Sequence, residues 1–264
     1  MGPARRSHAT ITVALRFYAQ LNGFLPIDKR QVEFACSLKE RAGIKDVIEA
    51  AGVPHTEVDL LLVNGDSVGF EYQVRDGDRI SVYPHFAVLD VGPVSRVRPE
   101  PVPEPRFLLD THLGKLAGHL RMLGFDTAYF NDCDDDVLAR LASEERRILL
   151  TRDRGLLKRG IVTHGCHVWE TDPERQLVEV LDRFDLTGEV KPFRRCLQCN
   201  GLLEPVAKEA IVDRLQPKTR LYYQEFARCR SCDRIYWKGS HYERMRHFIA
   251  WLLEPGARPE PGLD

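Results

Sequence analysis

Residues 106–124, RFLLDTHLGKLAGHLRMLG, join a short apolar run to an amphipathic segment. The run RFLLD (106–110) is typical of a buried strand that ends in an aspartate. In the segment after it, leucine and alanine recur at i, i+3, i+4, i+7 and i+10, which is one face of a helix: Leu113, Leu116, Ala117, Leu120 and Leu123. Gly124 is a typical helix end. The stretch therefore predicts a strand followed by a helix.

The same alternation continues along the chain. Three further strands are expected at DTAYF (126–130), RILLT (147–151) and GCHVWE (165–170), and two further helices at DDDVLARLASEE (134–145) and DPERQLVEVLDRF (172–184). Repeated strand–helix alternation implies right-handed crossovers and a mostly parallel sheet. We therefore expect an α/β domain over residues 106–190.

The N-terminal part has a different pattern. Strands are expected in ITVALRFYAQL (11–21), EVDLLLVNG (57–65) and DGDRISVYP (76–84), and a helix in SLKERAGIKDVIEAAGV (37–53). Strands on both sides of one helix predict a β-grasp domain over residues 9–88. LLLVNG and GDRISVYP resemble the ubiquitin-like sulfur carriers typified by MoaD and ThiS. Those proteins end in a free diglycine, whereas this chain continues with VYPHFAVLDVGPV (82–94). An interaction or stabilising module, with a protein partner, is thus expected rather than a sulfur carrier.

Bulk properties favour a multidomain chain without membrane segments. Its 264 residues exceed the usual size of one domain. VGPVSRVRPEPVPEP (91–105) contains five prolines and predicts a stiff, extended linker, and residues 254–264 predict a disordered tail. No apolar run reaches the roughly 18 residues of a membrane helix, and MGPARRSHAT lacks the apolar core of a secretory signal. A cytoplasmic location is expected.

Acidic residues follow the predicted parallel strands. Asp110 and Asp153 come after two of them, and a run from Asp132 to Asp136 opens a predicted helix. Each acid alone is explained equally well as a helix cap or by the helix dipole. Because carboxyl ends of parallel strands share one edge, however, the acids are expected to converge. Clustered carboxylates repel unless a cation neutralises them, and hard oxygen ligands suit Mg²⁺ or Mn²⁺.

Such a site predicts metal-dependent hydrolysis of phosphodiesters. Basic residues near the acids are candidate phosphate ligands, with solvated surface charge as the alternative explanation. These predicted substrate-binding residues are Lys115, Arg121, Arg152 and Arg154.

Two longer stretches, FLLDTHLGKLAGHLRMLGFDT (107–127) and DDVLARLASEERRILLTRDRGLL (135–157), resemble the Mut-seven C-terminal RNase domain, a branch of the PIN-like nucleases. The resemblance extends over about residues 106–247 and implies ribonuclease activity. It implies that Asp110 and Asp153 are catalytic metal ligands, together with an acid before the second helix. Asp134 is the better match for that acid, with Asp135 as a rival. Asp172 is a weaker candidate for a fourth acid.

Four of the seven cysteines form two CxxC pairs, RCLQCNG and RCRSCDR. Cys196 and Cys199 are separated from Cys229 and Cys232 by 29 residues. This spacing is typical of a tetrahedral zinc ribbon, and a chain without an export signal favours metal over disulfides or a redox pair. Because all four ligands come from the protein, the zinc is predicted to be structural, in a module over residues 191–250. The following RIYWKG (234–239) predicts a short strand.

The chain's net charge of −1 conceals a basic C-terminal part. Residues 191–247 contain 13 Lys and Arg against 6 Asp and Glu, a surplus of +7 that a zinc tetrathiolate would lower to +5. Such a surplus, with Tyr236 and Trp237 in its midst, suits single-stranded nucleic acid, although both rings can equally pack the ribbon. The leading prediction is a metal-dependent endoribonuclease with RNA as partner. The alternative is a non-catalytic RNA-binding or adaptor protein. Since PIN-like proteins often pair, a homodimer is a candidate assembly.

Overall fold

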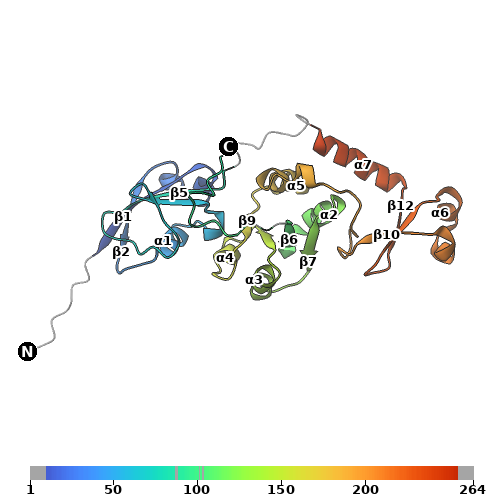
Figure 1. Ribbon diagram of the computed structural model, residues 1–264, viewed down its shortest axis with the longest axis horizontal. Coiled ribbons are helices and arrows are strands. Elements are labelled where there is room, and N and C mark those ends of the chain that lie inside the picture. Colours follow the sequence, from blue (N-terminus) through green and yellow to red (C-terminus); the bar gives the residue numbers. More distant parts are fainter. Residues whose placement is uncertain (1–9, 87–88, 101, 103, 255–264) are drawn as a thin grey trace, which may run out of the picture. The chain divides into compact units, whose positions relative to one another are not determined.

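A computed structural model describes residues 10–86, 89–100, 102 and 104–254 (Figure 1). Its described part contains three β-sheets and divides into two compact units. The first unit contains the described residues up to position 100 together with Ala142–Glu145 and Asp153–His167. The second contains Val102–Leu141, Arg146–Arg152 and the described residues from Val168 on. The domain boundaries expected from the sequence, at residues 9–88, 106–190 and 191–250, stay predictions.

A five-stranded mixed sheet with one helix dominates the first unit. Its strand order is β2-β1-β5-β3-β4, with β1 and β5 parallel and the other neighbours antiparallel. The elements are β1 (Ile11–Phe17), β2 (Phe34–Leu38), α1 (Ile44–Ala50), β3 (Leu60–Val63), β4 (Asp66–Ser67) and β5 (Arg79–Tyr83). Short 3₁₀ helices cover Ala19–Phe24, Ile27–Lys29 and His55–Glu57. Alternate β1 residues Val13, Leu15 and Phe17 are buried beside Ile44 and Ile48 of α1. This arrangement confirms the N-terminal β-grasp sheet.

The helix of this unit is shorter than the sequence indicated. Helix α1 begins at Ile44, whereas Ser37 and Leu38 belong to β2, opposite Thr12 and Ile11 of β1. The prediction of helix over residues 37–43 was therefore wrong. The apolar residues at helical spacing begin only at Ile44, and Ser37 and Leu38 pair with β1 instead.

The first part of the proline-rich segment packs on this unit. Val97 is 8% exposed within its core. Arg98 donates hydrogen bonds of 2.7 and 2.5 Å to the two carboxylate oxygens of Asp59, and the Ser95 hydroxyl donates to the Asp59 carbonyl oxygen at 2.6 Å. An extended spacer was thus the wrong prediction for residues 91–98. Val97 and the bidentate ion pair between Arg98 and Asp59 hold the segment in place. Of the predicted tail, residues 255–264 lie outside the described residues.

A mostly parallel sheet with flanking helices follows, as predicted. The strand order is β7-β6-β8-β9, and β6 pairs in parallel with both β7 and β8. The elements are β6 (Arg106–Leu109), α2 (Gly114–Met122), β7 (Asp126–Tyr129), α3 (Asp135–Glu144), β8 (Ile148–Thr151), α4 (Arg154–Leu157), β9 (Gly165–His167) and α5 (Pro173–Arg183), with 3₁₀ turns at Thr111–Leu113 and Thr187–Glu189. Central strand β6 is fully buried from Phe107 to Leu109. Its carboxyl end therefore has a parallel strand on either side.

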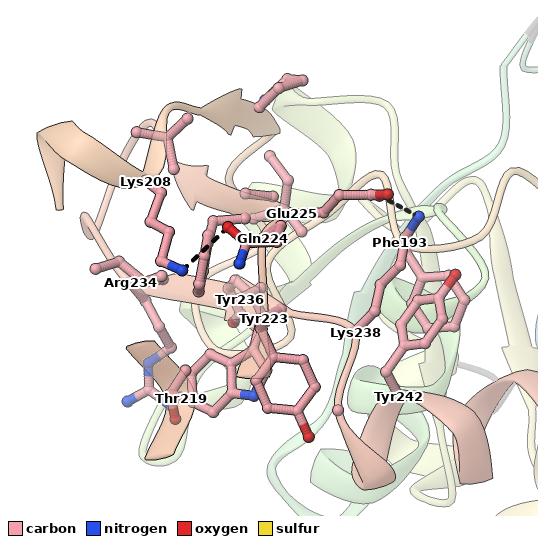
Figure 2. Close-up of a pocket in the computed structure, with 18 of the residues that line it drawn as sticks. Phe193, Lys208, Thr219, Tyr223, Gln224, Glu225, Arg234, Tyr236, Lys238 and Tyr242 are labelled. Atoms are coloured by element: carbon pink, nitrogen blue, oxygen red, sulfur yellow. Dashed lines mark hydrogen bonds and ion pairs between the residues drawn. The ribbon is translucent and has the colours of Figure 1, made fainter. Parts of the chain in front are cut away.

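The C-terminal part of the second unit is a three-stranded antiparallel sheet in the order β10-β11-β12. Its elements are β10 (Leu203–Val206), α6 (Pro217–Tyr222), β11 (Phe226–Cys229), β12 (Ile235–Trp237) and α7 (Ser240–Leu253), with 3₁₀ turns at Lys208–Ala210 and Val212–Arg214. Residues of this sheet, of α6 and of the start of α7 line one pocket (Figure 2). Among the described residues, no helix is both long and apolar enough to cross a membrane.

Candidate metal centres

Asp110 lies at the carboxyl end of β6 and is 5% exposed. One carboxylate oxygen accepts hydrogen bonds from the Thr111 amide (2.5 Å) and hydroxyl (3.1 Å). The other accepts from the hydroxyl of Thr151, the last residue of β8, at 2.7 Å. The Asp110 amide donates to the Leu150 carbonyl oxygen at 3.1 Å. The carboxylate is therefore held where two parallel strands end, and it also caps the turn that leads into α2.

Asp153 follows β8 by two residues and caps α4. Its Oδ1 atom accepts hydrogen bonds from the Gly155 amide at 2.6 Å and the Leu156 amide at 3.4 Å. The side chain is exposed. It belongs to the first unit, whereas Asp110 belongs to the second. Capping thus accounts for the local structure of Asp153.

The acid run opens α3, as expected. The Asp134 carbonyl oxygen accepts hydrogen bonds from the Val137 and Leu138 amides, and Asp135 is the first helical residue. Asp134 is exposed and Asp135 is half-buried. The choice between these two as the predicted ligand stays open. Asp172, the weaker fourth candidate, caps α5 by accepting from the Glu174 and Arg175 amides.

The predicted acids do not form a compact ligand set here. A metal site needs at least three His, Cys, Asp or Glu side chains whose ligand atoms lie close together. Among the described residues, the four cysteines form such a group, with ligand atoms within 4.8 Å of one another. Asp110, Asp134 and Asp153 belong to no such group. Their role as divalent-ion ligands stays a prediction.

The four predicted phosphate ligands differ in their surroundings. Lys115 is exposed on α2. Arg152 is exposed and donates to the Glu170 carbonyl oxygen at 2.5 Å. Arg154 donates to the Phe24 carbonyl oxygen at 3.1 Å, and its guanidinium lies 5.0 Å from the centre of the Phe24 ring.

The prediction that Arg121 binds phosphate was wrong. It is 5% exposed, and its guanidinium donates to the carbonyl oxygens of Thr127 (2.9 Å), Leu197 (3.1 Å) and Gln198 (3.0 Å). A buried guanidinium that binds three carbonyl groups holds structure together and does not reach a phosphate. This burial could not be predicted, because the helical spacing that marks the apolar face of α2 does not show which polar residue is buried beside it.

The segment that carries Asp153 is bound to other residues of the first unit. Lys158 Nζ donates to the Glu49 carbonyl oxygen at 2.6 Å, and the His167 amide donates to Glu57 Oε1 at 2.6 Å. His55 lies between Glu49 Oε1 (2.6 Å from Nδ1) and the Val162 carbonyl oxygen (2.9 Å from Nε2). Sequence reasoning missed all of these contacts, since neither periodicity nor a motif singles out His55 or Glu57.

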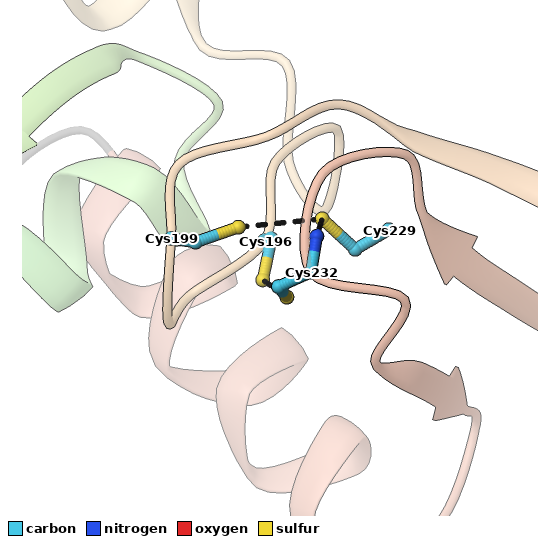
Figure 3. A group of neighbouring side chains, drawn as sticks. All are labelled: Cys196, Cys199, Cys229 and Cys232. Carbon is cyan, nitrogen blue, oxygen red and sulfur yellow. Dashed lines mark hydrogen bonds between the residues drawn. The ribbon is translucent and has the colours of Figure 1, made fainter.

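The four cysteines meet as predicted (Figure 3). Their Sγ atoms lie 3.6 Å apart for Cys196 and Cys232, and 3.4 Å apart for Cys199 and Cys229. A zinc–sulfur bond of about 2.3 Å places tetrahedral sulfurs about 3.8 Å apart, so the cluster has nearly the size that Zn²⁺ requires. The residues present therefore fit a metal ion.

Both CxxC turns have the same backbone. The Cys196 amide donates to the Gly201 carbonyl oxygen and the Asn200 amide to the Cys196 carbonyl oxygen. The Cys229 amide donates to the Arg234 carbonyl oxygen and the Asp233 amide to the Cys229 carbonyl oxygen. Asn200 and Asp233 both have positive φ angles, 69° and 59°, which short polar side chains tolerate. Two equivalent turns thus present two sulfurs each, as a closed structural metal site requires.

The crowding of the four thiols changes their pKa values in opposite directions. Burial raises the pKa of Cys196, but hydrogen bonds, first from the Tyr236 hydroxyl, lower it to about 7. Burial and neighbouring thiols raise the pKa of Cys199 to about 12. Four sulfurs this close cannot all ionise unless a positive ion compensates their charge.

Comparison with protein families gives two matches. The family described as the Mut7-C RNAse domain matches residues 105–249, more than half of the chain. The chain belongs to the Mut7-C RNAse domain family. The Mut7-C ubiquitin family matches residues 10–90, the five-stranded unit. Neither the curated proteins nor the solved structures that were compared gave a match.

In this Mut7-C RNAse domain a polar network joins the first cysteine turn to the parallel sheet. Asp126, the first residue of β7, lies 2.7 Å from Arg147 NH1 and 3.3 Å from Arg195 NH2, and it accepts from Asn200 Nδ2 at 2.8 Å. Asn200 Oδ1 in turn accepts from the Thr127 amide at 3.0 Å. Together with Arg121, these contacts attach the cysteine turn to the edge of the sheet, so the ribbon and sheet form one unit.

Proposed function

We propose that this chain is a metal-dependent ribonuclease that hydrolyses RNA phosphodiesters at an acidic site containing Asp110, Asp134 and Asp153. The observation that carries the proposal is the place of Asp110, buried at the carboxyl end of the central parallel strand of a Mut7-C RNAse domain. Ligands bind at this edge in open parallel sheets. Asp153 follows Thr151, whose hydroxyl binds Asp110, by only two residues. Chain geometry therefore keeps the Cα atoms of Thr151 and Asp153 within about 7 Å of each other.

The proposed roles follow from the side chains. Asp110, fixed by Thr111 and Thr151, is the rigid ligand, and Asp153 and Asp134 at helix starts complete an oxygen donor set that suits Mg²⁺ or Mn²⁺. A bound ion of this kind acidifies a water molecule and neutralises charge on the phosphate. Lys115, Arg152 and Arg154 are the proposed phosphate ligands, and Arg121 no longer belongs to this set. The four cysteines are proposed to bind a structural zinc ion.

The test is cleavage of mixed cellular RNA by the full chain with Mg²⁺ or Mn²⁺. Asp110→Asn and Asp153→Asn keep the size of each side chain and an oxygen that can cap a helix. Each variant is expected to lower the rate by at least about 100-fold, because losing a ligand exceeds the 10- to 100-fold effect of losing a residue that supports one. Asp213→Asn, in the ribbon, is the control and should cleave at the parental rate.

A non-catalytic RNA-binding or adaptor protein is the alternative outcome. It would be shown by RNA binding without cleavage across metals and substrates. Equal cleavage by the parent and both variants would instead refute the assignment of Asp110 and Asp153 to the site. The homodimer and the cytoplasmic location stay predictions, as does a protein partner for the Mut7-C ubiquitin domain.

A further inference from the structure

The pocket on the cysteine-bound sheet has aromatic walls. It has a volume of about 1180 Å³ and is lined by β10, β11, β12, α6 and the first turns of α7. Tyr223 and Trp237 lie 6.5 Å apart between ring centres, at 45°, and Phe193 and Tyr242 lie 4.4 Å apart, at 39°. Figure 2 shows Tyr223 and Tyr236 between Lys208 and Lys238 in this view. The cavity therefore offers flat apolar faces with ammonium groups at their sides.

Two aromatic residues of the pocket lining, Tyr222 and Trp237, are more exposed than core packing explains. Tyr222 is 71% exposed and Trp237 is 40% exposed. Neighbouring Leu221 is 67% exposed. Exposed aromatic residues that gather around one cavity mark binding surfaces in soluble proteins. Tyr236 is different, since its hydroxyl lies 3.0 Å from Cys196 Sγ and is thus bound to the cysteine cluster. The metal site consequently supports one wall of the pocket.

The charge of the pocket favours an anionic ligand. Its lining contains five Lys or Arg residues against three Glu residues. Lys238 lies 2.5 Å from Glu225 and Lys208 donates to Gln224 at 3.0 Å, so the ends of both lysines are held at the pocket. Lys218, on α6, is exposed. The surrounding residues 191–247 have a surplus of +7, as counted above. A ligand with phosphates and flat faces matches both properties.

We propose that this pocket binds unpaired bases of single-stranded RNA, which stack on Tyr222, Tyr223 and Trp237 while their phosphates meet Lys218 and the neighbouring basic residues. A duplex does not fit this description, because its base faces are hidden in the stack. The residues that line the pocket do not include Asp110, Asp134 or Asp153, the acids proposed to bind the catalytic ion. The inference deepens the proposed ribonuclease function, because it names the strand state of the RNA.

The test measures binding separately from cleavage. The full zinc-containing chain is titrated into a fluorescein-labelled oligouridylate of about eight nucleotides, a length within the site sizes of single-strand binders. Fluorescence anisotropy is recorded without added Mg²⁺ or Mn²⁺, and a gel then checks that the RNA is intact. A duplex of the same length and a peptide with the sequence of residues 93–105 serve as competitors. We expect the single strand to bind at least about tenfold more tightly than the duplex, since only it exposes base faces.

Variants test the stacking directly. Tyr222→Leu and Trp237→Leu keep an apolar side chain but remove the aromatic face, and each should weaken binding by about tenfold, the middle of the range for one lost stack. Tyr222→Phe and Trp237→Phe should bind like the parent. Trp251→Leu is the matched control. Trp251 is an exposed tryptophan as well, at 36%, but it lies on α7 outside the pocket lining. Lys218→Gln should lower the slope of log Kd against log salt by about 0.7. Zinc content verifies that each variant is folded.

Three results would overturn the inference: equal binding by the leucine variants and the parent, tighter binding of the duplex, or displacement of the RNA only by the proline-rich peptide. These results do not depend on catalysis. If Asp110→Asn and the parent both fail to cleave while binding still depends on Trp237, the ribonuclease proposal fails and the pocket stands. If cleavage occurs but the stacking variants bind normally, the pocket proposal fails alone.

Discussion

The hydroxyl of Thr151, the last residue of β8, binds the carboxylate that follows the neighbouring strand β6. It donates at 2.7 Å to Asp110, a carboxylate that is 5% exposed. A buried charge is costly unless hydrogen bonds replace its water, and Thr151 and Thr111 supply three donors between them. Their effect is to fix one orientation of the carboxylate at the end of β6.

Thr151→Val tests this positioning. Valine has nearly the same shape but no hydroxyl, so the free energy of unfolding should fall by about 1 kcal/mol. Cleavage, if Asp110 binds the catalytic ion, should fall by about 10- to 100-fold, as for other residues that orient a metal ligand. The control is Thr127→Val, since Thr127 is equally buried and its hydroxyl donates to the Phe125 carbonyl oxygen instead. It should lose similar stability but keep its activity. Equal rates in both variants would remove Thr151 from the site.

Asp126 makes stability depend on pH. Burial raises the pKa of its carboxyl, but the hydrogen bonds from Arg147 and Asn200 and the charge of Arg195 outweigh burial, so its pKa is below the ordinary value. Its contribution is therefore fully present above the unfolded pKa of about 3.9 and is lost as the pH falls through the lower folded pKa. Asp126→Asn should lower the free energy of unfolding by about 2 kcal/mol at neutral pH. Urea titrations should show that difference shrinking below about pH 4. A difference that is constant with pH would contradict this account.

Individual residues were predictable only where the backbone fixes them. Asp110 and Asp153 follow apolar strands, and their positions at strand ends follow from the pattern itself. Arg121 and Lys115 lie on one helix and look alike in the sequence, yet the first is buried under a cysteine turn and the second is exposed. Which one meets solvent depends on residues 197 and 198, some 76 positions away, and no local pattern contains that information.

The cysteine turns are the elements that sequence described best, because ligand spacing alone defines them. Helix α7 and strands β10 and β11 were not predicted. In α7 only Ile249 and Leu252 are buried, so its apolar periodicity is weak. Strand β10 contains a proline at position 205, which is unusual within a strand and hides the pattern. The packing of residues 91–98 was missed because the proline-rich composition of residues 91–105 hides Val97, whose side chain lies in the core of the first unit.

Metal removal should act on the ribbon as a unit. The chain is expected to contain one zinc ion, and Cys199→Ser should lose it, because three thiolates and a hydroxyl bind zinc much more weakly. Without metal the two turns lose their common ligand, and the pocket wall that Tyr236 forms through Cys196 should become mobile. Elemental analysis and tryptophan fluorescence measure the two effects. Cys133→Ser is the control, since Cys133 lies outside the cluster. A Cys199→Ser variant with full zinc content would refute the ligand set.

The segment that carries Asp153 is bound to residues far away in the sequence, which concerns the molecule as a whole. Its segment, Asp153–His167, belongs to the first unit together with the Mut7-C ubiquitin domain, whereas Asp110 and Asp134 belong to the second. Arg154, Lys158 and Val162 each bind a residue of that domain through one of the contacts described above. The ubiquitin-like domain thus holds in place a segment of the Mut7-C RNAse domain that carries a predicted catalytic acid. We therefore predict that one use of the ubiquitin-like domain is to hold this segment in place.

His55→Leu tests that use. Leucine keeps apolar contact with Phe70, whose ring lies 5.8 Å from that of His55, but it loses the bonds to Glu49 and Val162. Hydrogen exchange of amides in residues 156–167 should accelerate by about 30-fold, equivalent to about 2 kcal/mol of local stability. The control is His119→Leu in the second unit, where the ring bonds the Pro173 carbonyl oxygen, and exchange in residues 156–167 should not change. If His55→Leu also weakens Mn²⁺-dependent cleavage while His119→Leu does not, the ubiquitin-like domain positions Asp153. Unchanged exchange in His55→Leu would show that the segment is held without it.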